Sequence, residues 1–211
     1  SKKVSNFYLI LVVLTLGLPA GLRASTVGID TSAYIRAFES AKRDYIGEIF
    51  ISYYEIGFQW MVKTLIFIFK DPHAVILIIS LLTVSLIIST LWHFKNKISF
   101  SLSVFVYTCI NYFDIYNISR QWLAISIVFF ATRFLLDRKY LKFAIIVVIA
   151  STIHSSAIIS LIFIPIHMLV AGKVPLKYKI LLMLSIVFFA IFNSQIFYYL
   201  GITDTIDNYQ L

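Results

Sequence analysis

Long apolar runs separated by short polar segments dominate the pattern along the chain. The runs are residues 7–22, 51–69, 73–92, 98–113, 121–136, 143–170 and 180–200. Six of the seven have 16–21 residues, close to or within the roughly 17–25 residues that a membrane-spanning helix needs. Strands of a membrane barrel would instead alternate apolar and polar positions over short segments, and blocks such as ILIISLLTVSLIIST do not. The pattern therefore predicts an all-α, polytopic integral membrane protein with about five to seven transmembrane, re-entrant or interfacial helices.

Composition supports this class and excludes several others. Of the 211 residues, 60% are hydrophobic and 13% are charged, against roughly 45–50% and 25% in soluble domains. The loops are too small for a separate soluble domain, so we interpret residues 1–211 as a single membrane domain. Cys109 is the single cysteine, which excludes a disulfide framework and a Cys-ligated zinc site. The histidines lack metal-ligand spacing and no nucleotide-binding fingerprint occurs, so we expect no metal and no cofactor.

The net charge of +8 raises the possibility of a nucleic-acid partner, but the distribution of the basic residues argues against it. They are scattered between apolar runs, at Lys95/Lys97, Arg138/Lys139/Lys142 and Lys173/Lys177/Lys179. Basic residues in short loops are typical of the cytoplasmic side of membrane proteins. We therefore expect the lipid bilayer as a partner and no nucleic acid.

The basic residues also predict an orientation. Lys2 and Lys3 place the start of the chain in the cytoplasm, so that run 7–22 leads to an external loop at about 23–50. An alternative for residues 1–24 is a secretory signal peptide, because a basic start, an apolar centre and a small-residue site follow one another. Arg23 would lie inside the cleavage site, which is unfavourable for that alternative.

The run 51–69 decides which loops face outward. If it crossed the membrane, the basic loops at 95–97 and 138–142 would both lie outside. Glu55, Gln59 and Lys63 follow one another at helical spacing, which forms a polar stripe on an apolar helix. We therefore predict an interfacial helix at about 51–69. The loop 114–120 then faces outward together with the loop 23–50.

The run 143–170 is too long for one upright helix. It contains His154 near its middle and Pro165 further on. The basic residues after it should lie in the cytoplasm, which a bent or re-entrant pair of helices would achieve. One long tilted helix is the other interpretation.

Ionisable groups are costly in or near a membrane, so each of the few present invites a functional hypothesis. The first cluster lies in the external loop and contains Arg23, Gly28, Asp30 and Tyr34. Gly28 permits a tight turn, and Asp30 can cap an amphipathic helix expected at 31–43. An alternative without substrate binding is an arginine that extends to the interface and an ordinary helix cap.

The second cluster is Asn117, Arg120 and Gln121, between two spans. An arginine that opens a helix beside amide side chains is suited to bidentate binding of phosphate or pyrophosphate. The helix N-terminus adds backbone N–H groups for the same anion. An ion pair between Arg120 and Asp114 at the interface is the structural alternative.

The third candidate is His154, which lies deep in an apolar run. A histidine there is often hydrogen-bonded by neighbouring helices and has no further role. It can also act as a general base or orient a ligand, because imidazole titrates near neutral pH. The residues alone leave both interpretations open.

The order of these clusters carries a family resemblance. The chain reads GLR-x(4)-GID-x(3)-Y, then N-x(2)-RQ-x(2)-A, then IHSSA-II before a proline-bearing segment, with EIGF at 55–58 and LSVF at 102–105. This resembles the EpsG family, a branch of the Wzy-like polymerases of bacterial exopolysaccharide and capsule pathways. The resemblance covers essentially the whole chain. Family members are longer, so we expect a fragment.

The resemblance implies a multi-pass protein of the bacterial cytoplasmic membrane that joins repeat units at its outer face. A glycan on polyprenyl pyrophosphate would be transferred to the terminal hydroxyl of another lipid-linked unit, beside other polysaccharide-assembly membrane proteins. Arg120 would bind the pyrophosphate with help from Arg23, and Asp30 or His154 would activate or orient the acceptor hydroxyl. The remaining expected substrate-binding residues are Tyr34, Asn117 and Gln121.

Two other functions compete with polymerisation. A non-catalytic component of polysaccharide assembly or export would tolerate substitution of Arg120 and His154. A membrane acyltransferase that decorates the glycan would also use histidine and arginine in apolar helices, but its loss would leave chain length unchanged.

Overall fold

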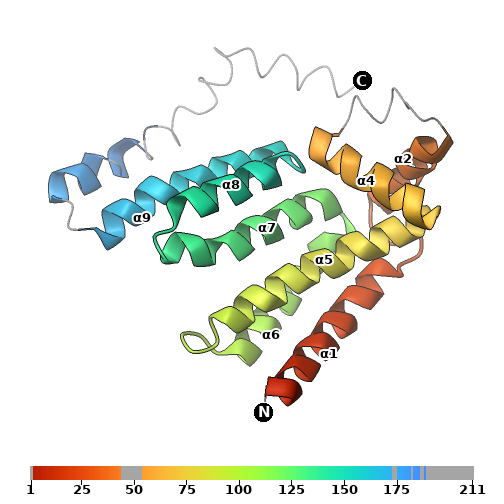
Figure 1. The fold of residues 1–211 in the computed structure, drawn as a ribbon, viewed down its shortest axis with the longest axis horizontal. Coiled ribbons are helices and arrows are strands. Elements are labelled where there is room, and N and C mark those ends of the chain that lie inside the picture. Colours follow the sequence, from red (N-terminus) through yellow and green to blue (C-terminus); the bar gives the residue numbers. More distant parts are fainter. Residues whose placement is uncertain (1, 44–53, 173–174, 182, 186–187, 189–211) are drawn as a thin grey trace. The chain divides into compact units, whose positions relative to one another are not determined.

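The computed structural model describes residues 2–43, 54–172, 175–181, 183–185 and 188. Within these ranges all the regular elements are helices, and Figure 1 shows their arrangement. The chain divides into two compact units, Ser1–Leu161 and Ile162–Leu211. The predicted all-α class is therefore confirmed for the described part of the chain.

Eight α-helices with defined bounds and two short 3-10 helices follow one another in the described residues, and residues 176–181 and 183–185 are helical as well. The elements with defined bounds are α1 (Lys2–Gly21), α2 (Thr31–Arg43), α4 (Ile56–Phe69), α5 (Pro72–His93), α6 (Phe100–Ile110), η1 (Tyr112–Tyr116), α7 (Ser119–Leu136), α8 (Tyr140–Ser151), η2 (Ser155–Ile162) and α9 (Phe163–Ala171). The helix expected at 31–43 is confirmed. Residues 44–53 and most of the run 180–200 lie outside the described residues.

The long apolar run 143–170 is broken in the structure. Helix α8 ends at Ser151, and residues 152–154 separate it from η2. The interpretation as one long tilted helix is therefore wrong. The physical reason lies at the break, where the carbonyl oxygen of Thr152 and the N–H of Ser155 bond to residues at the start of α4 instead of continuing the helical ladder.

Helices α1, α5, α7 and α8 lie side by side in that order within the first unit (Figure 1). Helix α5 is apolar on all sides, which suits an element buried between two neighbours. Gly17 and Gly21 lie one turn apart on α1, and a Cβ on either would collide with Leu81 or Leu77 of α5. Small residues at this spacing let two helix backbones approach closely.

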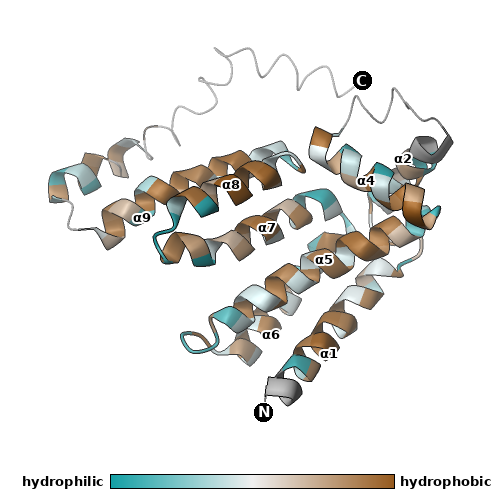
Figure 2. Cartoon of the chain, viewed as in Figure 1, coloured by the Kyte–Doolittle hydropathy of each residue, from teal (hydrophilic) through white to brown (hydrophobic). Residues whose placement is uncertain are grey.

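Helix α5 is the one described helix whose length and apolar composition suffice to cross a membrane. Apolar residues also dominate α1, α7 and α8, while hydrophilic residues gather at the connections between helices (Figure 2). The shorter apolar helical segments are Asn6–Gly21, Ile56–Phe69, Phe100–Ile110, Tyr140–Ser151 and Ser155–Ala171.

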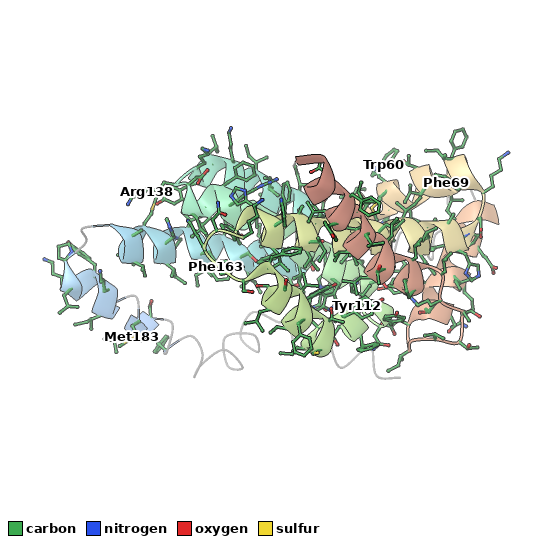
Figure 3. All side chains as sticks on the ribbon, turned by 90° about the horizontal axis from the view of Figure 1, so that it is seen from below. Trp60, Phe69, Tyr112, Arg138, Phe163 and Met183 are labelled. Atoms are coloured by element: carbon green, nitrogen blue, oxygen red, sulfur yellow. The ribbon has the colours of Figure 1, made fainter. Side chains whose placement is uncertain are left out.

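Tyr112 of η1 anchors the core between α1, α5 and α6. Its ring is buried, and its hydroxyl donates to the backbone oxygen of Leu16 at 2.7 Å. Figure 3 shows Tyr112 among the packed side chains, whereas Trp60 and Phe69 of α4 lie at the edge. Trp60 is 67% exposed, so α4 keeps one apolar face uncovered within the first unit.

The connections between helices fall into two groups, one at each end of the layer that α1, α5, α7 and α8 form. At one end, residues 23–31 are hydrogen-bonded to residues 116–119. At the other end, Asp137 lies within electrostatic range of His93 and Lys97. The loops expected outside thus share one end, and the two basic loops at 95–97 and 138–142 share the other.

Candidate functional site

Arg23 joins three helices at the first of these ends. It follows the last turn of α1 and is 5% exposed. Its Nε donates to Oγ1 of Thr31 at 2.8 Å, and its Nη2 donates to Oγ of Ser119 at 2.9 Å. Its Nη1 donates to the backbone oxygen of Ala20 at 2.6 Å. Each guanidinium nitrogen therefore has a protein acceptor, and the side chain ties α1 to the first residues of α2 and α7.

The loop after Arg23 lies against the connection between η1 and α7. The backbone N–H of Ile29 donates to Oδ1 of Asn117 at 2.9 Å, and the hydroxyl of Thr31 donates to the backbone oxygen of Tyr116 at 3.2 Å. Gly28 has φ +86° and passes so close to Tyr116 that a Cβ would collide with its carbonyl oxygen. Only glycine adopts this conformation at little cost.

Glu55 is the centre of a second network. One carboxylate oxygen, Oε2, contacts Nη1 of Arg120 in a salt bridge. The other, Oε1, accepts a hydrogen bond of 2.8 Å from the backbone N–H of Ser155. Nδ1 of His154 lies 3.4 Å from the same Oε1. Three segments far apart in sequence therefore meet at one carboxylate.

The backbone explains why these segments meet. The N–H groups of Gly57 and Phe58 donate to the carbonyl oxygen of Thr152, at 2.8 and 3.2 Å. The first N–H groups of a helix have no partner inside it, and here the break after α8 supplies one. A Cβ at Gly57 would collide with Thr152. The glycine therefore permits the approach that brings Glu55 to His154.

Aromatic rings surround the guanidinium of Arg120. Its Cζ lies 5.0 Å from the ring centroid of Tyr54 and 5.9 Å from that of Phe58, within the range of cation–π attraction. Tyr34 of α2 stacks on Tyr54 with the centroids 6.3 Å apart. The network thus has one wall of aromatic side chains.

The environment sets the charges of this network. Burial acts to raise the pKa of Glu55, but the hydrogen bond from Ser155 and the charges of Arg120 and His154 outweigh it, so that this pKa lies below its usual value. Burial, aided by the charge of Arg120, lowers the pKa of His154 despite the nearby carboxylate. At neutral pH we therefore expect an ionised Glu55 and a neutral imidazole.

His154 is placed to present one ring nitrogen. Its Nδ1 is buried and faces Glu55 without completing a hydrogen bond to any described residue. In a neutral imidazole one nitrogen carries the proton and the other accepts. We assign the proton to Nδ1 because a carboxylate lies beside it, which leaves Nε2 as the acceptor.

The structure distributes the expected site residues over the two networks. Arg120 and His154 belong to the Glu55 network, and Tyr34 lies in its aromatic wall; Arg23 and Asn117 belong to the loop network. Asp30 is half-buried within electrostatic range of Tyr34 and Tyr54. Gln121, also half-buried, follows Arg120 on α7.

Two expectations need correction. Arg120 pairs with Glu55, so the alternative pair with the exposed Asp114 is wrong. Glu55 is also no part of a polar helical stripe, because it precedes the first residue of α4, and Gln59 is buried. The role of Glu55 was missed, although an acidic residue ahead of a long apolar helix, within the EIGF segment, was an available signal.

The described part of the chain is an all-helical assembly with a buried polar cluster at one end. The sequence model of the EpsG family matches residues 6–211. The chain therefore belongs to the EpsG family, which is associated with exopolysaccharide assembly. No curated protein and no solved structure matches it.

Proposed function

We propose that the chain is the polymerising subunit, or part of it, of an exopolysaccharide or capsule pathway. It would join oligosaccharide repeat units that are carried on polyprenyl pyrophosphate. The observation that carries this proposal is the convergence of Arg120, Glu55 and His154 beside an aromatic wall. An anion-binding arginine and an oriented neutral base are the two groups that the reaction needs.

The proposed reaction is a glycosyl transfer. The terminal hydroxyl of one lipid-linked unit attacks the anomeric carbon of the glycan on another. A new glycosidic C–O bond forms, and the bond between the anomeric carbon and the pyrophosphate oxygen breaks. The proton of the hydroxyl passes to the base, and polyprenyl pyrophosphate leaves as the anion.

Arg120 is proposed to bind the leaving pyrophosphate. It occupies the first turn of α7, where backbone N–H groups favour an anion. A guanidinium carries five N–H donors, enough to hold Glu55 and a phosphate oxygen together. Charge that develops on the leaving group is thereby stabilised where it appears.

His154 is proposed as the base. Glu55 lies beside Nδ1, in the relation by which a carboxylate orients a catalytic imidazole. The lowered pKa of His154 keeps the ring able to accept a proton at neutral pH. Asp30, near Tyr34 and Tyr54, is proposed to orient the acceptor sugar.

Arg23 is proposed to position the site. Its donors are engaged by Ala20, Thr31 and Ser119. Because Ser119 immediately precedes Arg120, Arg23 fixes the start of the helix that presents the anion-binding group. Its effect on pyrophosphate is therefore indirect.

We also propose that the protein is multi-pass in the bacterial cytoplasmic membrane. The basic loops near Lys97 and Asp137 share one end of the layer, and the networks of Arg23 and Glu55 are built from the loops expected at the other. The positive-inside rule assigns the basic end to the cytoplasm. The site would then open to the outer face, where α4 lies in the interface.

Polymer analysis in a strain that lacks the native copy tests the proposal. The strain is complemented with the full-length wild type, Arg120→Ala, or Arg36→Ala, which removes an exposed arginine of α2. Arg120→Ala should lower polymer by roughly 100-fold or more, with single lipid-linked units accumulating and protein remaining in the membrane. Arg36→Ala should behave as wild type.

Three results contradict the proposal. Normal polymer with Arg120→Ala at wild-type protein level would exclude the anion-binding role. Polymer that forms normally but stays inside the cell would instead support an export component. Unchanged chain length with loss of acyl groups would support an acyltransferase.

A further inference from the structure

An apolar groove lies between α5, α6 and α7, on a different side of α7 from the Glu55 network. Its volume is about 660 Å³ and its lining is mostly aliphatic or aromatic. The groove runs beside α5, the described helix whose length and apolar composition suit it to cross a membrane. The side chains that decide its chemistry are Ser99, Ser103, Tyr107, Asn111 and Trp122.

Two donors inside this groove have no acceptor among the described residues. The hydroxyl of Tyr107 is buried, with 6% of the residue exposed, and Nε1 of Trp122 is buried as well. Leaving a buried donor unpaired is costly, so both groups favour an occupant that brings an oxygen acceptor. The two rings are neighbours, with centroids 6.5 Å apart.

The groove is polar at one end and apolar along its length. Tyr107, Asn111 and Trp122 lie where α6 ends and α7 begins, whereas Ser99 caps the far end of α6. Helix α6 has 11 residues, which correspond to about 16 Å at 1.5 Å per residue. These dimensions fit a single extended hydrocarbon chain with an oxygen-bearing head.

We infer that this groove binds the polyprenyl chain of the lipid-linked substrate, with an oxygen at its head accepting from Tyr107 and Trp122. The inference rests on the proposed function. Trp122 lies two residues after Arg120 on α7, so the polar end of the groove opens at the end of the helix that would hold the pyrophosphate. This relation favours the carrier lipid over a bulk phospholipid.

Photo-crosslinking tests the inference without any need for turnover. The full-length protein in nanodiscs of phosphatidylethanolamine and phosphatidylglycerol is labelled with a diazirine-bearing polyprenyl phosphate, and labelled peptides are mapped by mass spectrometry. Labels should fall in residues 98–111 and 122–129. Unlabelled polyprenyl phosphate should remove them, and added phospholipid should not.

Two serines on α6 provide a matched pair. Ser103 lines the groove, whereas Ser101 is exposed and is not part of the lining. Ser103→Phe should fill the groove and reduce labelling about tenfold, while Ser101→Phe should leave labelling unchanged. The isosteric Tyr107→Phe, which removes the unpaired hydroxyl, should weaken binding of polyprenyl phosphate roughly 3- to 10-fold.

Several outcomes would overturn the inference. Labels removed equally well by phospholipid would identify a bulk lipid as the occupant. Labels outside the groove, equal effects of the two serine variants, or unchanged binding to Tyr107→Phe would each exclude the site. If Arg120→Ala makes normal polymer while groove labelling remains specific, the proposed function is wrong, but the groove still binds polyprenyl phosphate.

Discussion

Oε1 of Glu55 and the backbone nitrogen of Ser155 are joined by a hydrogen bond of 2.8 Å across 100 positions of the sequence. The contact has a counterpart, because the N–H of Gly57 donates to the carbonyl oxygen of Thr152. The start of α4 thus finds an acceptor at the end of α8, and the first N–H of η2 finds one in Glu55. Glu55 therefore caps a helix and balances Arg120 with the same carboxylate.

This double role predicts different outcomes for two substitutions of Glu55. Glu55→Gln keeps an acceptor for Ser155 but removes the charge, so we expect a folded protein without polymer. Glu55→Ala removes both and should lower the free energy of unfolding by a further amount of about 0.5–2 kcal/mol, the usual cost of losing a helix cap. Thermal unfolding in detergent and polymer length are measured, with Glu39→Ala on the exposed face of α2 as the control. Equal stability of the two Glu55 variants would contradict the capping role.

Arg23 should matter for folding before it matters for catalysis. Arg23→Ala leaves Thr31 and Ser119 without their buried partner, and a hydrogen bond to a charged group contributes about 1.5–3 kcal/mol. We expect a loss of at least about 3 kcal/mol of stability and little protein in the membrane. Arg36→Ala, an exposed arginine, should change neither quantity. Stable Arg23→Ala protein that makes no polymer would instead indicate direct contact with substrate.

Gly28 should not tolerate a side chain. Alanine at φ +86° is strained by about 1–2 kcal/mol, and its Cβ would also collide with the carbonyl oxygen of Tyr116. Gly28→Ala should therefore separate the loop from α7 and lower the unfolding temperature, while Ser25→Ala in the exposed part of the loop should be neutral. Limited proteolysis of the loop locates the change. An unaltered cleavage pattern would show that the loop accommodates the methyl group.

The pKa shifts predict how stability depends on pH. The folded-state pKa of Glu55 lies below its ordinary value of 4.5, so its stabilising contribution is complete above pH 4.5 and is lost as pH falls through the lower folded value. The pKa of His154 is lowered from 6.5, so protonation of this ring opposes folding as pH falls below 6.5. As pH falls from neutral, unfolding temperatures should decline first below pH 6.5, through His154, and then further below pH 4.5, through Glu55. Glu55→Gln should lack the decline below pH 4.5, and a persisting decline would assign it to another group.

His154→Gln should retain the fold and lose polymerisation, because glutamine accepts hydrogen bonds but does not take up a proton at neutral pH. Asp30→Asn should retain partial activity, since Asp30 is proposed to orient the acceptor. The exposed His73 supplies the control variant His73→Gln. Polymer length and membrane level are compared for all three. Active His154→Gln together with inactive Asp30→Asn would move the role of base to Asp30.

The sequence predicts those elements whose structure depends on local pattern. The apolar run 73–92 became α5, Pro72–His93, with a side-chain cap from Asp71. The amphipathic stretch after Asp30 became α2, Thr31–Arg43. Both helices follow from their own composition and from the signals at their first residues. All of this information lies within one short stretch of the sequence.

The contacts at the candidate site could not be derived in the same way. Arg120 was singled out by its position at a helix start, but its partner lies 65 positions earlier. Asp114 is nearer in sequence, and only the packing of α4 against the break at residues 152–154 brings Glu55 closer. Likewise, nothing in the residues around His154 predicts that its Nδ1 faces the carboxylate of Glu55.

Arg23 bonds directly to Thr31, so the two ends of the intervening loop are held by one side chain. Residues 24–27 are exposed, and the loop returns to the protein through Ile29 and Asn117. An additional residue among 24–27 would extend into solvent and leave the anchored ends in place. Insertions and deletions between members of the EpsG family should therefore concentrate in this turn, while the flanking arginine and threonine keep their register to α7.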